Sequence, residues 1–360
     1  MIRLKLISFM NIFTKRVLIA IGTAAATLAI ASGCAKETSE DNSGLDKSYL
    51  EAWMNIKHPG ISPSGLGIYV LEDTPGTGAA VTDEDFYYFV DYTVTDLDGN
   101  ISATTSEKLA QRVGTFSQTN YYGPDIFIAD RSYTEAGVLD MISGMRVGGT
   151  RTAVIPGWLN VNLDYETGEE YEKRASGTNV IYTVSLRDKA ADITKWEIDS
   201  LERYVSINMA GVDSTKFGYY SRTIKAPTDT ATFKSDTNYF INYTGRLLNG
   251  KVFDTTIEDT AKVHGIYSAS KTYAPMYVTP APSGDGYKSV TISTSSTESG
   301  NTVVDGFAYC LSKIRPHEKV VCVFYSSLGY GYSGKSPIIP KFAPLIFEIE
   351  VVDGDTGLVL

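Results

Sequence analysis

The chain has 360 residues and carries 32 Lys and Arg against 42 Asp and Glu, a net charge of −10. Proteins that bind nucleic acids present a basic surface, so this acidic balance argues against a nucleic-acid partner. Three Cys and three His cannot supply a disulfide framework, and they argue against a structural zinc site. The length favours two domains.

The N-terminal segment, residues 1–33, has the pattern of an export signal. Lys15-Arg16 precedes an apolar run, residues 17–31, that is too short to span a bilayer. The run ends in Ala31-Ser32-Gly33-Cys34, which resembles a bacterial lipobox. We therefore expect lipidation at Cys34 and a protein anchored to the outer membrane, facing the periplasm or the cell surface. The alternative is an ordinary cleavage site followed by an incidental cysteine.

Residues 34–46 are polar and are predicted to form a flexible tether. The acidic cluster Ser39-Glu40-Asp41 resembles the export signals that send lipoproteins of the Bacteroides group to the cell surface. A solvated linker would have a similar composition, so this cluster alone leaves both interpretations open.

The chain after the tether contains one unit twice, at an offset of 151 residues. The offset relates Leu50-Glu51 to Leu201-Glu202, Tyr92-Thr93 to Tyr243-Thr244, Gly99 to Gly250, and Thr104-Thr105 to Thr255-Thr256. So many matches without gaps indicate a true repeat, and a period this long predicts tandem domains rather than a solenoid.

Each unit begins with a helical pattern and continues with short strands. Apolar residues recur at helical spacing around residues 49–56 and 198–205, and Asp192 is a plausible N-cap of the second helix. Strands are predicted over residues 88–94 and 239–244, and the dipeptides Asp98-Gly99 and Asn249-Gly250 that follow them predict hairpin turns. Alternating strands over residues 180–186 and 345–352 close the two units.

The second unit resembles the FKBP-type (macrolide-binding) peptidyl-prolyl isomerases over roughly residues 218–353. The resemblance is carried by four segments in the family's order: 241–245 (INYTG), 249–256 (NGKVFDTT), 303–307 (VVDGF), and 328–350, which contains LGYG, PIIP and LIFEIE. It implies an α+β fold in which each domain is a twisted antiparallel sheet wrapped on one short helix. A long insertion rich in Ser, Thr, Pro and Gly, residues 257–302, departs from the family pattern.

The resemblance also implies the position of a proline-binding bowl. Its lining residues would be Tyr243, Phe253, Val303, Val304, Phe307 and Phe347, with Asp254 and Tyr330 at the rim and Ile338 and Ile339 on an overhanging loop. Phe307 would form the floor, where the family commonly has Trp. Aromatic residues at strand spacing are usually core residues, so the prediction depends on Phe253-Asp254 together with Tyr330.

The first unit resembles the family more weakly. The repeat places Ser102 and Ala103 where the second unit has Phe253 and Asp254, and Val138 where it has Phe307. We therefore expect the first unit to have lost the bowl and to serve as a docking or chaperone-like module.

Isomerisation of an X–Pro bond requires no cofactor, metal or nucleophile. Twisting the amide costs about 18–20 kcal/mol of resonance energy. A pocket that removes water from the amide favours the twisted form, in which the carbonyl is less charge-separated. We therefore expect an apolar bowl with one or two polar groups at its rim.

The sequence thus predicts a degenerate FKBP-like domain with an N-terminal helix (47–190), a linker helix (191–217) and an isomerase domain (218–360) that acts on X–Pro bonds of exported proteins. The rival hypothesis is a non-catalytic binding or assembly module, and a role in glycan uptake has no direct support in the residues. Cys310 and Cys322 lie in apolar surroundings that favour free thiols, although an oxidising compartment permits a disulfide. Residues 283–301 are predicted to form a mobile loop.

Overall fold

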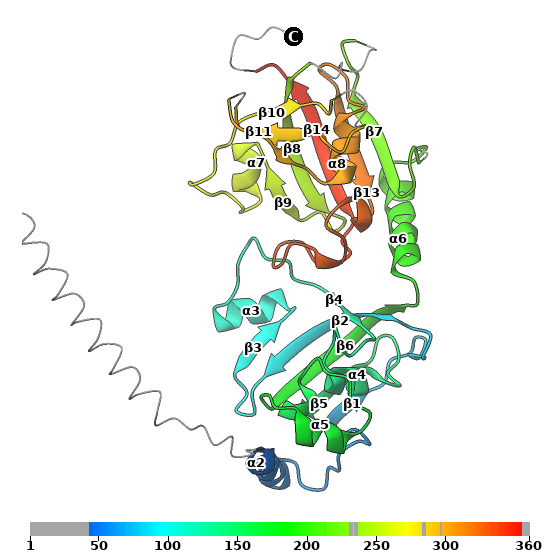
Figure 1. Ribbon diagram of the computed structural model, residues 1–360, viewed down its shortest axis with the longest axis vertical. Coiled ribbons are helices and arrows are strands. Elements are labelled where there is room, and N and C mark those ends of the chain that lie inside the picture. Colours follow the sequence, from blue (N-terminus) through cyan, green and yellow to red (C-terminus); the bar gives the residue numbers. More distant parts are fainter. Residues whose placement is uncertain are drawn as a thin grey trace, which may run out of the picture. The chain divides into compact units, whose positions relative to one another are not determined.

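The computed structural model describes residues 43–212, 214–229, 233, 237–282, 286–295 and 297–354 (Figure 1). The predicted export signal, Cys34 and the tether as far as residue 42 lie outside these residues. The tether is expected to reach residue 46, but helix α2 (Ser43–Lys57) already begins at Ser43. Asp46 lies in its first turn, where a carboxylate interacts favourably with the helix dipole, which accounts for the earlier start.

A six-stranded antiparallel sheet forms the first domain, which we define as residues 69–190. Its strands are β1 (Tyr69–Thr74), β2 (Tyr87–Thr95), β3 (Ile101–Thr104), β4 (Asp125–Ile128), β5 (Thr150–Ile155) and β6 (Val180–Ala190). Its helices are α3 (Glu107–Val113), α4 (Ala136–Ile142) and α5 (Gly168–Arg174), with a 3-10 turn η1 (Gly157–Leu159). The strand order is β1-β5-β6-β2-β3, and β4 pairs with β2.

An eight-stranded antiparallel sheet forms the second domain, defined as residues 219–352. Its strands are β7 (Tyr219–Lys225), β8 (Tyr239–Leu247), β9 (Val252–Thr255), β10 (Met276–Thr279), β11 (Thr291–Ser293), β12 (Asn301–Thr302), β13 (Lys319–Phe324) and β14 (Leu345–Val352). Its helices are α7 (Glu258–Val263) and α8 (Asp305–Leu311), with 3-10 turns η2 (Ser326–Leu328) and η3 (Gly331–Ser333). The order is β12-β11-β10-β8-β14-β13-β7, and β9 pairs with β8.

The two predicted hairpins are confirmed. In the first domain β2 pairs with β3, and in the second β8 pairs with β9, each across its predicted turn dipeptide. Gly99 and Gly250 have φ angles of 90° and 86°, which a residue with a Cβ rarely adopts. The turn chemistry therefore sets both hairpins locally.

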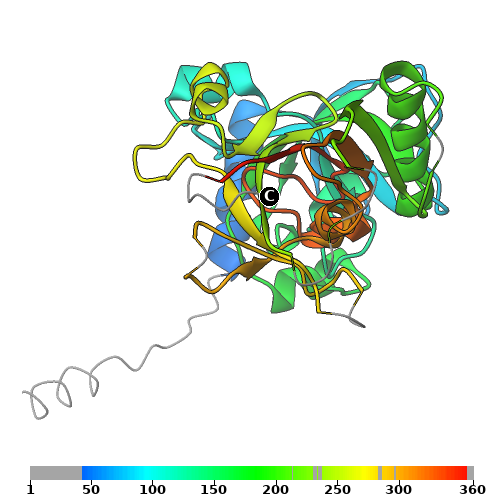
Figure 2. The same cartoon turned by 90° about the horizontal axis from the view of Figure 1, so that it is seen from above.

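Side chains of the second sheet alternate between two apolar layers. On β13, Val320, Cys322 and Phe324 pack in the layer that contains α8, whereas Val323 packs with the helix α6 (Ile193–Asn208). Successive strand residues point to opposite faces, so a fully buried strand must be apolar on both. Helices α6 and α8 accordingly lie on opposite sides of the sheet (Figures 1 and 2).

Helix α6 begins as the sequence predicts. The Asp192 side chain accepts a hydrogen bond from the backbone N–H of Lys195 at 3.1 Å, which is the N-cap interaction. Leu201 and Val205 on its buried face, and Met209 at its C-cap, pack against the second sheet. The helix is therefore held by packing and capping together.

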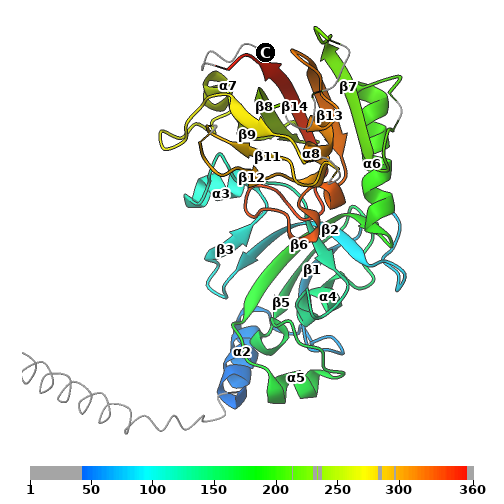
Figure 3. The same ribbon diagram turned by 45° about the horizontal axis from the view of Figure 1, so that its top comes forward.

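Residues 283–301, within the insertion of the second domain, are not the simple loop that their composition predicts. Of residues 283–301, the structure describes all but 283–285 and 296, and part of this segment pairs as β11 and β12 at the edge of the sheet (Figure 3). Ser and Thr residues are compatible with an edge strand, and the hydrogen bonds to β10 favour the extended state. The hairpin places Ile292, Asn301 and Thr302 beside helix α8.

Gly306 allows α8 to approach the sheet closely. A Cβ at this position would lie 2.4 Å from the ring of Phe324. We expect Gly306→Ala to lower the free energy of unfolding by about 1–3 kcal/mol, because overpacking outweighs the gain of about 1 kcal/mol in helix propensity. Urea unfolding would measure this change, and an equal or higher stability of the variant would contradict the close packing.

Candidate functional site

A cavity of about 270 Å³ lies in the second domain between its sheet and helix α8. The eight residues predicted to form the bowl and its rim all line it: Tyr243, Phe253, Asp254, Val303, Val304, Phe307, Tyr330 and Phe347. They come from strands β8, β9 and β14, from helix α8 and its approach, and from the loop after η2. The fold therefore brings together residues that are widely separated in the sequence, and we call this cavity the bowl.

The bowl is built from aromatic rings packed edge to face. Phe307 lies 4.8 Å from Phe347 and 5.4 Å from Tyr243 between ring centroids, and Phe253 lies 5.6 Å from Phe347. Gly245 leaves the space for these rings, because a Cβ there would lie 2.6 Å from Phe253 and 2.9 Å from Phe347. Interlocked rings of this kind give the cavity rigid apolar walls.

One carboxylate, that of Asp254, lies at the rim and is held from two sides. Its Oδ2 accepts a hydrogen bond from the Tyr243 hydroxyl at 2.8 Å, and Lys271 forms an ion pair with its Oδ1. Lys271 also donates to the backbone carbonyl of Thr255 at 2.9 Å. The carboxylate is 40% exposed, so solvent reaches it while its position stays defined.

Both tyrosines of the bowl remain protonated donors at physiological pH. Burial, together with the neighbouring Asp254 carboxylate, raises the pKa of Tyr243 far above its usual range. The same two causes raise the pKa of Tyr330. The bowl therefore offers hydroxyl groups and a carboxylate but no group poised to act as a nucleophile.

Five further residues line the bowl or reach its rim, and none of them was predicted from the sequence. Four of them belong to the insertion and line the bowl: Met276, Ile292, Asn301 and Thr302. Lys271, also in the insertion, reaches the rim through Asp254. The sequence around these five residues contains no recognisable motif. The four lining residues reach the bowl only because strands β10, β11 and β12 pair with one another.

The two residues expected on an overhanging loop lie elsewhere. Neither Ile338 nor Ile339 lines the bowl; Ile339 is 2% exposed within the core of the second domain, and Ile338 packs against that core. Apolar side chains in this loop gain more by burial than by exposure at the rim. The loop itself, residues 331–344, contacts the first domain: the backbone N–H of Tyr121 donates to the carbonyl of Pro337 at 2.8 Å.

Comparison with known proteins agrees with this geometry. A family model described as FKBP-type peptidyl-prolyl cis-trans isomerase matches residues 285–352, which include helix α8 and strand β14. A curated protein of Haemophilus influenzae, named probable FKBP-type peptidyl-prolyl cis-trans isomerase, is 23% identical over 197 residues, 54% of this chain and 68% of that protein. Both findings support the resemblance of this chain to the FKBP-type peptidyl-prolyl cis-trans isomerases.

Solved structures are also similar to parts of this chain. A peptidyl-prolyl isomerase of Pseudomonas syringae is 21% identical, with 44% of this chain and 93% of that one covered and a TM-score of 0.30. FkpA of Escherichia coli is 24% identical, with 46% and 60% covered and a TM-score of 0.30. The three FKBP domains of wheat FKBP73 are 12% identical, with 79% and 94% covered and a TM-score of 0.28.

The expected fold of two tandem FKBP-like domains, each an antiparallel sheet packed on a short helix, is confirmed. In the first domain, Ser102 and Ala103 occupy the positions of Phe253 and Asp254. Ala103 pairs with Val94 in the register in which Asp254 pairs with Gly245, and the Ser102 hydroxyl donates to the backbone carbonyl of Val94 at 3.3 Å.

The described residues include two of the three cysteines of the chain. Cys310 and Cys322 are both buried and free, so the disulfide that the compartment would permit is not formed. In the described part of the chain no group of three or more His, Cys, Asp or Glu side chains is arranged to hold a metal ion. None of the described helices is long and apolar enough to cross a membrane.

Proposed function

We propose that the bowl of the second domain catalyses cis–trans isomerisation of X–Pro bonds in exported proteins. The observation that carries this proposal is the convergence of all eight predicted residues on one cavity. An apolar bowl of this size accepts a proline ring and removes water from its amide. Loss of solvation costs the planar, charge-separated amide more than the twisted one, so the barrier falls.

The rim groups position the substrate rather than react with it. Val304 is the N-cap of helix α8, and the first backbone N–H groups of a helix have no partner within it. They are available to donate to a substrate carbonyl beside the proline. Asp254, held by Tyr243 and Lys271, lies at the rim of the bowl, where it orients the peptide. No step in this mechanism requires a cofactor.

The test is the cis-to-trans rate of a short X–Pro peptide in the presence of the whole chain. We expect a rate that increases in proportion to enzyme concentration. A folded chain that leaves the uncatalysed rate unchanged would support the rival function, a non-catalytic module that binds or assembles proteins of the cell envelope.

We also propose that the protein is exported and anchored to the outer membrane by lipid on Cys34, so that its polypeptide clients are envelope proteins. The lipobox-like segment supports this proposal. We expect Cys34→Ser to move the protein from the membrane fraction to the soluble fraction and to abolish incorporation of labelled fatty acid. Equal lipid labelling of both forms would contradict the anchor, and an impermeant label applied to intact cells would distinguish the surface from the periplasm.

A further inference from the structure

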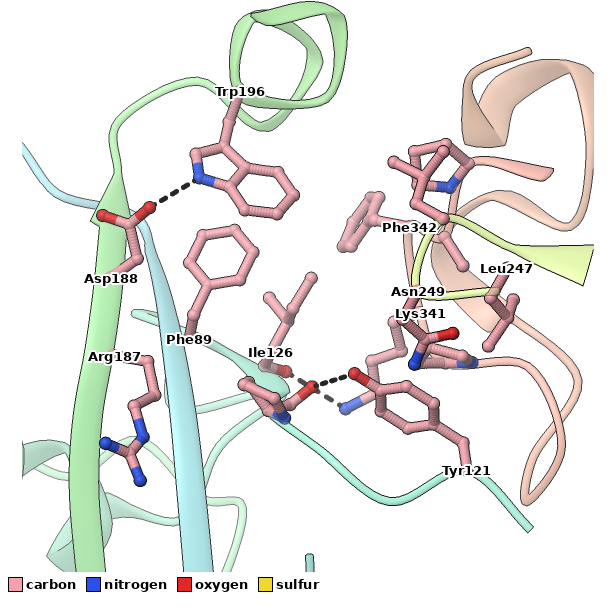
Figure 4. Close-up of a pocket in the computed structure, with 15 residues that line it drawn as sticks. Phe89, Tyr121, Ile126, Arg187, Asp188, Trp196, Leu247, Asn249, Lys341 and Phe342 are labelled. Carbon is pink, nitrogen blue, oxygen red and sulfur yellow. Dashed lines mark hydrogen bonds between the residues drawn. The ribbon is translucent and has the colours of Figure 1, made fainter. Parts of the chain in front are cut away.

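A second cavity, of about 290 Å³, lies where the first domain, helix α6 and the second domain meet (Figure 4). Phe89 and Trp196 form one wall, with their rings stacked at 4.0 Å between centroids. Leu247 and Phe342 lie across the cavity from them, as Figure 4 shows. We call this cavity the aromatic cleft.

Polar groups around the aromatic cleft are already bound to neighbouring protein groups. The Trp196 ring N–H donates to Asp188 at 2.8 Å, and the Lys341 ammonium donates to the backbone carbonyl of Ile126 at 3.3 Å. Arg187 pairs with Asp91 at 2.6 Å. A charged ligand would lose its hydration without gaining a free partner of opposite charge, so the cleft favours an uncharged apolar group.

The size of the aromatic cleft limits what it holds. Pockets for drug-sized ligands begin at about 300 Å³, so this cavity suits one ring or side chain rather than a larger molecule. Its walls are mainly aromatic rings, which pack well against another ring. A single aromatic side chain therefore matches both the volume and the chemistry.

The aromatic cleft and the bowl are joined by two segments of the second domain. Strand β8 carries Tyr243 into the bowl and Leu247 into the cleft, and these positions are roughly 13 Å apart along a strand. Residues 331–344 lead from the rim at Tyr330 to the cleft at Phe342. An extended polypeptide covers this separation with about four to six residues.

We infer that the aromatic cleft is a second binding site for the polypeptide substrate, and that it takes an aromatic side chain about four to six residues from the proline in the bowl. This inference rests on the proposed function, because the bowl must hold the proline. It names the substrate class of the enzyme: X–Pro segments with an aromatic residue nearby.

The test uses the whole chain and three kinds of peptide. The first is a tetrapeptide with one X–Pro bond, the second is a longer peptide with Phe four to six residues from the proline on either side, and the third has Ser in place of Phe. We expect kcat/KM for the best Phe peptide to exceed that for its Ser counterpart on the order of tenfold, mainly through KM.

Asn249→Trp fills the cleft from an exposed turn, and Asp98→Trp is its matched control, since Asp98 is the exposed counterpart of Asn249 in the repeat. We expect Asn249→Trp to remove the preference for Phe while leaving tetrapeptide turnover unchanged, and Asp98→Trp to keep both. Phe342→Ala, which removes a wall of the cleft, should also reduce the preference in a chain whose Tm confirms that it is folded.

Equal kcat/KM for the Phe and Ser peptides in the wild-type chain would overturn the inference, as would a preference that survives Asn249→Trp. Binding of the same peptides by calorimetry separates the cleft from catalysis. If no peptide is isomerised, the proposed function fails, but tighter binding of the Phe peptide that is lost in Asn249→Trp would still support the cleft. Equal binding of both peptides would reject it.

Discussion

Phe253→Ala is expected to lower kcat/KM for a short X–Pro peptide by about ten- to a hundredfold. The half-buried Phe253 ring lines the bowl and packs against Phe347 at 5.6 Å. Burial of such a side chain contributes about 1.5–3 kcal/mol, and each 1.36 kcal/mol corresponds to a factor of about ten in rate. The loss should be in activity rather than folding, because Phe253 lies on β9, which pairs only with β8 among the strands of the described residues.

The matched control is Ser102→Ala, which changes the corresponding position of the first domain. We expect this variant to retain full activity, because the first domain lacks the Phe-Asp pair of the bowl. Circular dichroism and Tm would show that both variants are folded. A Phe253→Ala chain with undiminished kcat/KM would place proline binding outside the bowl, and a loss in Ser102→Ala would assign activity to the first domain.

Glu197→Gln is expected to stabilise the protein at pH 8 by roughly 3 kcal/mol. Glu197 lies on α6, is 1% exposed, and within the described residues its Oε1 has no hydrogen-bond partner. Burial raises the pKa of this carboxyl from 4.5 to about 7, although hydrogen bonds from Ser326 oppose the rise. Ionisation of this buried group is therefore costly in the folded state.

The direction of the pH dependence follows from proton binding. Below pH 4.5 the carboxyl is protonated in both states, so burial of its charge costs nothing. Between about pH 4.5 and 7 the unfolded chain loses the proton while the folded chain keeps it, so stability falls as pH rises. Above about pH 7 both states are ionised and the full penalty remains.

Chemical unfolding from pH 5 to 8 would measure this contribution. We expect the difference in stability between Glu197→Gln and the wild type to grow with pH and then to level off above about pH 7. Glu202→Gln, on the exposed side of the same helix, should leave the pH profile unchanged. A difference that stays constant over this range would show that the Glu197 carboxyl does not titrate there.

The repeat and the two hairpins could be predicted from the sequence because their signals are local. A turn dipeptide such as Asn249-Gly250 needs a positive φ at its glycine, and the Asp192 cap bonds to a residue three positions away. The bowl could be predicted because its members occur in motifs whose order and spacing match a known family. These features depend on residues that are close in the sequence or on the order of motifs, so they can be recognised from the sequence alone.

The tertiary structure alone decided which side chains meet across the sheet and between the domains. Ile339 lies in the core rather than at the rim, Lys271 reaches Asp254 from a segment without a motif, and Glu197 is buried against Ser326. Each of these outcomes depends on contacts with residues distant in the sequence. The sequence by itself determined the repeat, the family resemblance and the expected bowl. Burial, ion pairing and the aromatic cleft were decided by packing, because the free energy of such contacts depends on partners that no local pattern specifies.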